Sequence, residues 1–216
     1  MGGNRPPQPR KTVRSPGDVE PLFEELRERL EKTPPKSLNL PGLVLREASV
    51  LIPLFFREGA PHVLFTKRTE SLRNHAGQIS FPGGARDESD PTPLHTALRE
   101  THEELGIPPH QIEVLGLLDE IPTITQFRVV PFVGVIPSNF PYLANSAEIE
   151  QIIEVPIAHL LKPEIQRMQV REVFGGEREI YFYDYREHVI WGATARMLRN
   201  LLQIIASLPS KPEVLK

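Results

Sequence analysis

The segment from Gly83 to Gly106 constrains the fold of this 216-residue chain more than any other. Gly83-Gly84 and Pro91-Thr92-Pro93 predict a helix that begins near Thr92, and Gly106 followed by Pro108-Pro109 predicts its end. Apolar or small side chains recur at helical spacing between these limits and form one stripe that can be buried: Leu94, Leu98, Thr101 and Leu105. The segment therefore predicts one amphipathic helix that follows a glycine turn.

This helix carries three acids, Glu100, Glu103 and Glu104, within about 100° of one another around its axis. Like charges at these spacings destabilise a helix by about 0.2 to 0.5 kcal/mol per pair, and the helix dipole disfavours negative charge near its C-terminus. A divalent cation such as Mg²⁺ or Mn²⁺ offsets both effects, because it prefers oxygen ligands. Arg99 can pair with Glu103 four residues on. The alternative interpretation is a solvated acidic face without a ligand.

Composition excludes several other kinds of site. The chain has no cysteine, which removes disulfides, thiolate catalysis and cysteine zinc sites. Its net charge of -3 provides no global basic field for nucleic acid or an anionic membrane. No apolar segment reaches the 18 residues of a membrane span, and the N-terminus lacks a signal-peptide pattern. We expect a cytoplasmic protein with no nucleic-acid or membrane partner.

The segment from Gly84 to Ile107 resembles a Nudix box, the pyrophosphohydrolase signature G-x5-E-x7-R-E-U-x-E-E-x-G-U. The matching positions are Arg99-Glu100, Glu103-Glu104 and Gly106-Ile107. Two features depart from the pattern. Asp90 replaces the first Glu and is separated from Arg99 by eight residues instead of seven, and Thr101 occupies a position that is usually aliphatic.

A second signature precedes the box. Leu64-Phe65-Thr66-Lys67-Arg68, Arg73, Gly77 and Phe81-Pro82-Gly83-Gly84 resemble the motif LLTxR[SA]x3Rx3Gx3FPGG of the coenzyme A pyrophosphatase branch of Nudix enzymes. The box of this chain, which is one residue longer and has Asp90 in place of the first Glu, also resembles the boxes of that branch. The resemblance implies an α/β class protein, a Nudix α/β/α sandwich with a mixed β-sheet. It also implies cleavage of coenzyme A or its acyl derivatives to 3′,5′-ADP and 4′-phosphopantetheine or its acyl form.

The resemblance assigns roles to individual residues. Glu100, Glu103 and Glu104 are the expected ligands of Mg²⁺ or Mn²⁺, and Glu103, Glu104 and Arg99 the expected catalytic residues of the box. Some Nudix enzymes supply a water-activating Glu from a later loop, so Glu148 is the candidate base; a solvated acid at a strand end is the alternative. The predicted substrate-binding residues are Arg68, Arg73, Gly83 and Gly84, because guanidinium groups suit phosphate and glycines permit close approach.

Two other functions stay open at this point. A Nudix enzyme of the same kind could hydrolyse another nucleoside diphosphate derivative, such as ADP-ribose, NADH or an oxidised nucleotide. A catalytically silent nucleotide-binding module on the same fold is the second alternative. Its expected mark is loss of the box acids, and this sequence retains all three.

The remaining chain divides into four parts. Residues 1–14 are rich in Pro, Gly and basic side chains and predict a disordered arm; residues 15–35 predict an amphipathic helix capped by Asp18. This helix packs on the main domain or on a partner subunit, so a homodimer stays open. Residues 36–208 form the Nudix domain, and 209–216 a tail. The expected strands of the Nudix domain are Leu43–Phe56, His62–Arg68, Gln111–Glu120, Gln126–Ile136, Glu148–Val155 and a hairpin from Glu179 to Trp191. Its expected helical segments are a turn at Pro156–Leu161 and a closing helix at Ala193–Leu208. Pro131 predicts an edge or a bulge in its strand.

Overall fold

The computed structural model describes residues 21–38, 42, 44–71, 76–173 and 176–210. Several predicted features lie outside these ranges: the arm 1–14, the Asp18 cap, Arg73 and residues 211–216 of the tail.

The main sheet has eight strands, and its central path runs β3-β2-β1-β7-β5. Three further strands extend this path, because β4 pairs with β1, β6 with β7 and β8 with β2. Strands β1 and β7 are parallel, and the other pairs are antiparallel, so the sheet is mixed. The strands are β1 (Arg46–Arg57), β2 (Ala60–Arg68), β3 (Ile79–Ser80), β4 (Gly83–Ala85), β5 (Glu113–Leu117), β6 (Ile121–Pro122), β7 (Phe127–Val135) and β8 (Ile149–Pro156).

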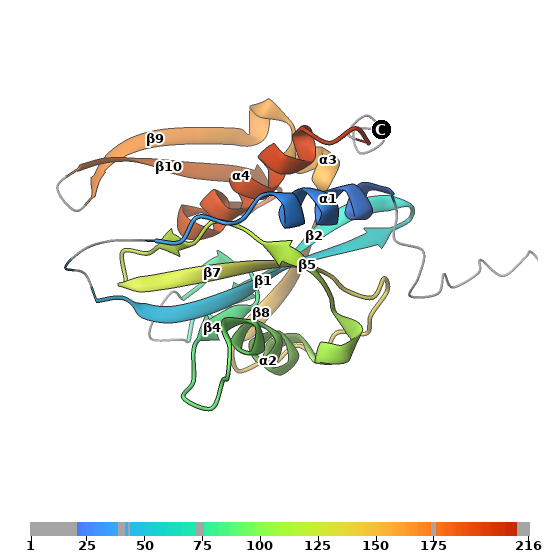
Figure 1. Cartoon of the computed structure of the whole chain (residues 1–216), viewed down its shortest axis with the longest axis horizontal. Helices are drawn as coiled ribbons and strands as arrows, with labels where there is room; N and C mark the ends of the chain where they lie inside the picture. Colours follow the sequence, from blue (N-terminus) through green and yellow to red (C-terminus); the bar gives the residue numbers. More distant parts are fainter. Residues whose placement is uncertain (1–20, 39–41, 43, 72–75, 174–175, 211–216) are drawn as a thin grey trace, which may run out of the picture.

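Helices cover both faces of this sheet (Figure 1). Helix α2 (Pro93–Leu105) lies on one face, where Ala97 and Leu105 pack against Leu51, Phe55 and Leu64. Helices α1 (Pro21–Lys32) and α4 (Gly192–Ala206) cover the other face with the larger core. This arrangement confirms the predicted α/β class and the mixed sheet between helical layers. Within the described part of the chain, no helix is long and apolar enough to cross a membrane.

The strand that contains Pro131 is not at an edge of the sheet, so that part of the prediction is wrong. Strand β7 lies between β1 on one side and β5 and β6 on the other. Pro131 faces the break between these two short strands, where its carbonyl accepts a hydrogen bond from the Leu118 N–H at 3.0 Å. A residue without an N–H is tolerated at such a break because no ladder donor is required there.

A second sheet of three antiparallel strands follows the main one, in the order β11-β10-β9. The predicted final hairpin is present as β10 (Gly176–Tyr185) and β11 (His188–Trp191), but strand β9 (Gln166–Val173) was not predicted. Every β9 side chain from Gln166 to Glu172 is exposed, so the strand lacks the half-buried alternation that reveals strands in a sequence. Short helical turns complete the chain: α3 (Ile157–Leu160), Pro109–Gln111 and Pro163–Ile165.

Helix α1 packs on the main domain, which decides between the two alternatives left by the sequence. Its apolar side chains Leu22, Phe23, Leu26 and Leu30 are all buried in the larger core. The ring of Phe23 lies 4.7 Å from that of Phe56 in β1. At the far end of the chain, the N–H and the hydroxyl of Ser210 both donate to Glu25. The described part of the N-terminal extension is therefore integral to the fold.

We expect Leu26→Ala to lower the free energy of unfolding by about 2 to 5 kcal/mol, because Leu26 is fully buried and its removal leaves a cavity. Denaturant unfolding followed by circular dichroism measures this change. Arg29→Ala on the exposed face of the same helix is the control and should stay within about 0.5 kcal/mol of the wild type. Equal stabilities of the two variants would contradict the packing of α1 on the core.

Candidate active site

Helix α2 begins and ends where the sequence predicts. Thr92 is the N-cap, and its side chain accepts a hydrogen bond from the His95 N–H, while Pro93 occupies the first turn. Gly106 is the C-cap with φ of 75°, and its N–H donates to the His102 carbonyl. The buried residue Thr101 replaces the usual aliphatic side chain without an unpaired hydroxyl, since its Oγ1 donates to the Ala97 carbonyl at 2.7 Å. These contacts fix the helix that carries the acids.

Asp90 anchors Arg99 with two hydrogen bonds, and this pairing accounts for the altered box. The guanidinium donates to both carboxylate oxygens of Asp90, from Nε at 3.0 Å and from Nη2 at 2.9 Å. The Thr96 hydroxyl and the Asp87 N–H also donate to Asp90. Chiefly through Arg99, these donors hold the pKa of Asp90 well below its usual range. The shorter acid therefore still reaches Arg99 across the longer spacing.

The opposite side of Arg99 positions two of the predicted metal ligands. Its Nη1 lies 3.0 Å from a carboxylate oxygen of Glu100 and 3.1 Å from one of Glu103. The predicted pairing with Glu103 is thus confirmed. Burial raises the pKa of Glu100, and Arg99 opposes that shift. One guanidinium consequently links the buried Asp90 to Glu100, the residue after the arginine, and to Glu103, one helical turn further on.

Glu104 differs from the other two acids because its side chain is only 3% exposed, whereas that of Glu103 is 54% exposed. The three acids therefore do not form one solvated face of the helix. Burial raises the pKa of Glu104 to about 8; Arg68 opposes this effect, and the charges of Glu100 and Glu148 add to it. The Glu104 Oε2 atom is buried and has no hydrogen-bond partner among the described residues.

Arg68, at the end of β2, is the basic group that faces this buried acid. Its Nη1 lies 3.7 Å from Glu104 Oε1, and its own Nε is buried without a hydrogen-bond partner in the described chain. A β-bulge occurs at this point, since Lys67 pairs with Gln151 but Arg68 pairs with Ile149. Glu150 is thus the extra residue of β8. The two partners of one ion pair thus carry a donor and an acceptor that find no hydrogen-bond partner among the described residues.

Glu148 lies just before β8, and a short turn holds it beside the buried acid. Its N–H donates to the Asn145 carbonyl, and its side chain accepts a 3.4 Å hydrogen bond from the Asn145 amide. The Asn145 N–H in turn donates to the Glu104 carbonyl at 3.0 Å. The charge of Glu148 raises the pKa of both Glu100 and Glu104, which places it in the same cluster. Asn145 was not identified from the sequence, where it appeared only as part of a loop.

The two glycines of the turn are required by close contacts. A Cβ atom on Gly84 would lie 2.5 Å from the carboxyl carbon of Glu100, and one on Gly83 would lie 2.3 Å from the Ser49 carbonyl oxygen. A side chain at either position would displace the acid or the strand beside it. The predicted approach of the glycine turn to the acids is therefore present.

The donor set is suited to a divalent cation, although the acids do not converge. Among the described residues, no group of three or more His, Cys, Asp or Glu side chains is arranged to hold a metal ion. Arg99 pairs with one oxygen of Glu100 and one of Glu103. However, a buried carboxylate oxygen that finds no donor in the described part of the chain, with a second carboxylate near it, fits a hard cation that prefers oxygen ligands.

The structure brings together most, but not all, of the predicted residues. Arg68, Gly83, Gly84, Arg99, Glu100, Glu103, Glu104 and Glu148 lie in one region around the start of β4, helix α2 and the β2–β8 edge. The predicted contribution of Arg73 lies outside the described residues. A hollow on the β9–β10 hairpin contains none of the predicted site residues.

Comparison with known proteins identifies the family. Residues 45–173 match the NUDIX domain. An uncharacterized Nudix hydrolase, NudL, from Cronobacter sakazakii is 36% identical over 87% of this chain and 93% of its own. The protein of that name from Salmonella paratyphi B is 41% identical over 74% of this chain and 83% of its own. A MutT/nudix family protein from Enterococcus faecalis superposes with a TM-score of 0.49 and 14% identity, covering 82% of this chain and 70% of that protein. The chain therefore belongs to the Nudix family, and it is a hydrolase that acts on pyrophosphate anhydrides.

Proposed function

We propose that the protein hydrolyses the pyrophosphate bond of coenzyme A or its acyl derivatives. The products are 3′,5′-ADP and 4′-phosphopantetheine or its acyl form. The observation that carries the proposal is the Arg68–Glu104 pair, in which a buried donor and a buried acceptor both lack partners among the described residues. Such groups gain most from a ligand that supplies phosphate oxygens to the arginine and a cation to the acid. The coenzyme A assignment is supported by the second signature, which runs from Leu64 to Gly84.

Glu100, Glu103 and Glu104 are the proposed ligands of Mg²⁺ or Mn²⁺. Such a cation would offset phosphate charge and lower the pKa of the attacking water. Nudix proteins in general depend on divalent ions, and the buried Glu104 oxygen supports a cation here. Arg99 maintains the spacing of Glu100 and Glu103 through its anchor on Asp90.

The protein side chains would divide the remaining tasks. Water adds to one phosphorus atom, the bridging P–O bond breaks, and the other phosphate leaves with the bridging oxygen. Glu148 accepts the proton of the water, since its carboxylate is half-exposed and the Asn145 amide orients it. Arg68 stabilises negative charge on the phosphates, and the backbone of Gly83 and Gly84 permits their close approach.

The substrate assignment is tested with the purified protein, Mg²⁺ or Mn²⁺, and equal concentrations of coenzyme A, an acyl derivative, ADP-ribose and NADH. We expect the highest kcat/KM for a coenzyme A compound, and chromatography should identify 3′,5′-ADP as a product. Faster hydrolysis of ADP-ribose or NADH would indicate a Nudix enzyme that acts on another nucleoside diphosphate derivative. No turnover of any compound would favour a silent binding module.

We expect Glu104→Gln to lower kcat by about 10²-fold or more, because the amide removes a carboxylate charge that the site requires. Glu148→Gln should also lower kcat, since glutamine cannot accept the proton. The matched control is Glu150→Gln, which changes an exposed acid paired with Lys67 two residues along the same segment. Steady-state kinetics measures these effects, and circular dichroism checks the fold. If Glu148→Gln and Glu150→Gln behaved alike, Glu148 would be only a solvated acid.

The raised pKa of Glu104 predicts how the stability of the metal-free protein depends on pH. The carboxyl group titrates near 4.5 when unfolded and near 8 when folded. Its contribution to stability is thus fully present below about pH 4.5 and is lost as pH rises through about 8. In EDTA, the Tm should fall between pH 5 and pH 8.5, and it should fall less for Glu104→Gln. Mn²⁺ should reduce the fall in the wild type, because a cation favours the ionised form. Parallel curves for the two metal-free proteins would contradict this assignment.

A further inference from the structure

Strand β9 forms the outer edge of the three-stranded sheet. It pairs with β10 without interruption over eight residues, from Gln166 to Val173, and within the described chain no strand pairs with its other side. In Figure 1 this hairpin extends beyond α4, with β9 on the side away from the main sheet. The strand has neither the proline nor the bulge that protects many exposed edges, and its charged side chains are Arg167, Arg171 and Glu172.

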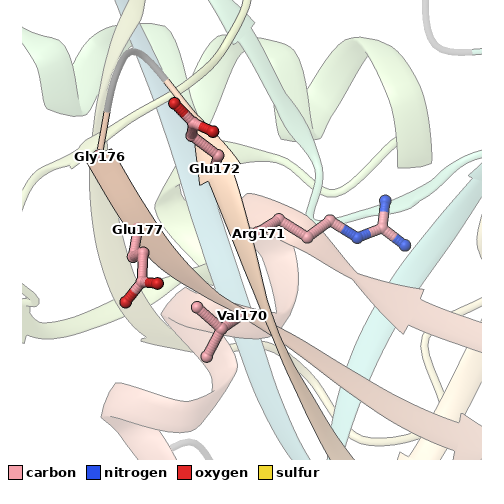
Figure 2. A pocket seen from close by; sticks show the side chains of 5 residues that line it. All are labelled: Val170, Arg171, Glu172, Gly176 and Glu177. Carbon is pink, nitrogen blue, oxygen red and sulfur yellow. The ribbon is translucent and has the colours of Figure 1, made fainter.

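This edge also exposes two large apolar side chains. Met168 is 50% exposed and Val170 is 54% exposed, and they lie on the same face of β9 because alternate residues share a face. Figure 2 shows the Arg171 side chain extending away from those of Val170 and Glu177, as this alternation requires. One face of the edge is therefore partly apolar, and the other carries Arg167, Gln169 and Arg171.

We propose that a second copy of this chain pairs with β9 through its own β9, antiparallel, with the two-fold axis at Val170. The two three-stranded sheets would then form one continuous six-stranded sheet. Backbone groups along the edge would gain partners, and the exposed apolar residues of both copies would cover each other. This proposal does not depend on the substrate or the chemistry of the active site.

Charge selects the register of this pairing. A two-fold axis perpendicular to the sheet keeps each face of β9 on the same side in both copies. Residues that lie opposite each other must then share a face, so the central residue lies opposite its own copy across the axis. Two registers pair seven residues of each strand, centred on Gln169 or on Val170. The first puts Arg167 opposite Arg171 twice, and like charges in opposite positions are destabilising. The second puts Gln169 opposite Arg171 and Met168 opposite Glu172, without a like-charge pair.

The Val170 register also brings the apolar side chains together. Val170 lies opposite Val170 of the second copy, and Met168 of each copy lies diagonal to that pair, within reach of a long side chain. Shifting the axis to Arg171 or Glu172 would instead place identical charges at the centre. The register centred on Met168 avoids like charges, but it pairs only five residues of each strand.

The absence of cysteine makes a direct test of the register simple. A single Val170→Cys substitution should yield a disulfide-linked dimer on mild oxidation, because opposite Cα atoms in antiparallel strands lie about 4.5 to 5.5 Å apart. Val189→Cys, at a similarly exposed position on β11, should not cross-link. Cross-linking of Val189→Cys as efficiently as Val170→Cys would overturn the proposed interface.

Two substitutions at Gln169 test the charge argument in solution. Gln169→Glu places an acid opposite Arg171 of the second copy at two symmetric positions, and should lower the dimer Kd by about 2- to 30-fold. Gln169→Arg should raise it by a similar factor. Gln169 is exposed and accepts one hydrogen bond, from Arg171 of its own strand, so either change should shift the Tm of the monomer only slightly. Analytical ultracentrifugation measures the Kd. A monomer at all concentrations, or equal Kd values for both variants, would overturn the proposal.

Discussion

The site depends on one electrostatic constraint, the burial of the Glu104 carboxyl beside the guanidinium of Arg68. A carboxylate that loses its hydration needs a compensating charge or donor, and Arg68 supplies only part of it at 3.7 Å. Glu100 and Glu148 add negative charge and increase the deficit. The protein thus maintains an acid that is costly to ionise by itself, and the proposed cation would make its ionised form favourable. This is the usual condition of a catalytic centre, where local stability is lower so that ligand binding is strong.

The rest of the site follows from a chain of contacts that starts at Asp90. This buried acid fixes Arg99, and Arg99 fixes Glu100 and Glu103. Of the four charged groups that α2 contributes to the site, these three therefore depend on the loop before the helix. The fourth, Glu104, is tied to the Asn145 turn through its own carbonyl group. Two loops therefore converge on one helix. The glycines at positions 83 and 84 allow this convergence because any larger residue would occupy the space of a neighbouring carboxylate or strand.

Much of the fold and the site could be predicted from the sequence, because strong local signals coincide there. The caps at Thr92 and Gly106, the acid spacing and the apolar strands each have a direct physical cause in neighbouring residues. The contact between Arg68 and Glu104 was not derivable in this way, since it depends on how β2 and α2 pack. Strand β9 was missed because its side chains are exposed, and Pro131 was misplaced because the break between β5 and β6 is a property of the whole sheet. Asn145 acts through hydrogen bonds to Glu148, three residues on, and to Glu104, which is distant in the sequence but adjacent in the fold.

The bulge between β2 and β8 has a further consequence for the reach of the active site. Because Glu150 is an additional residue in β8, the Thr69 N–H pairs with the carbonyl of Glu148, at 2.8 Å. In a regular ladder Glu148 would lie one step further along, about 3.3 Å from its present position. The bulge in β8 thus sets the separation between Glu148 and Arg68. Deleting Glu150 would restore a regular ladder and leave Glu148 at its present step beside Arg68.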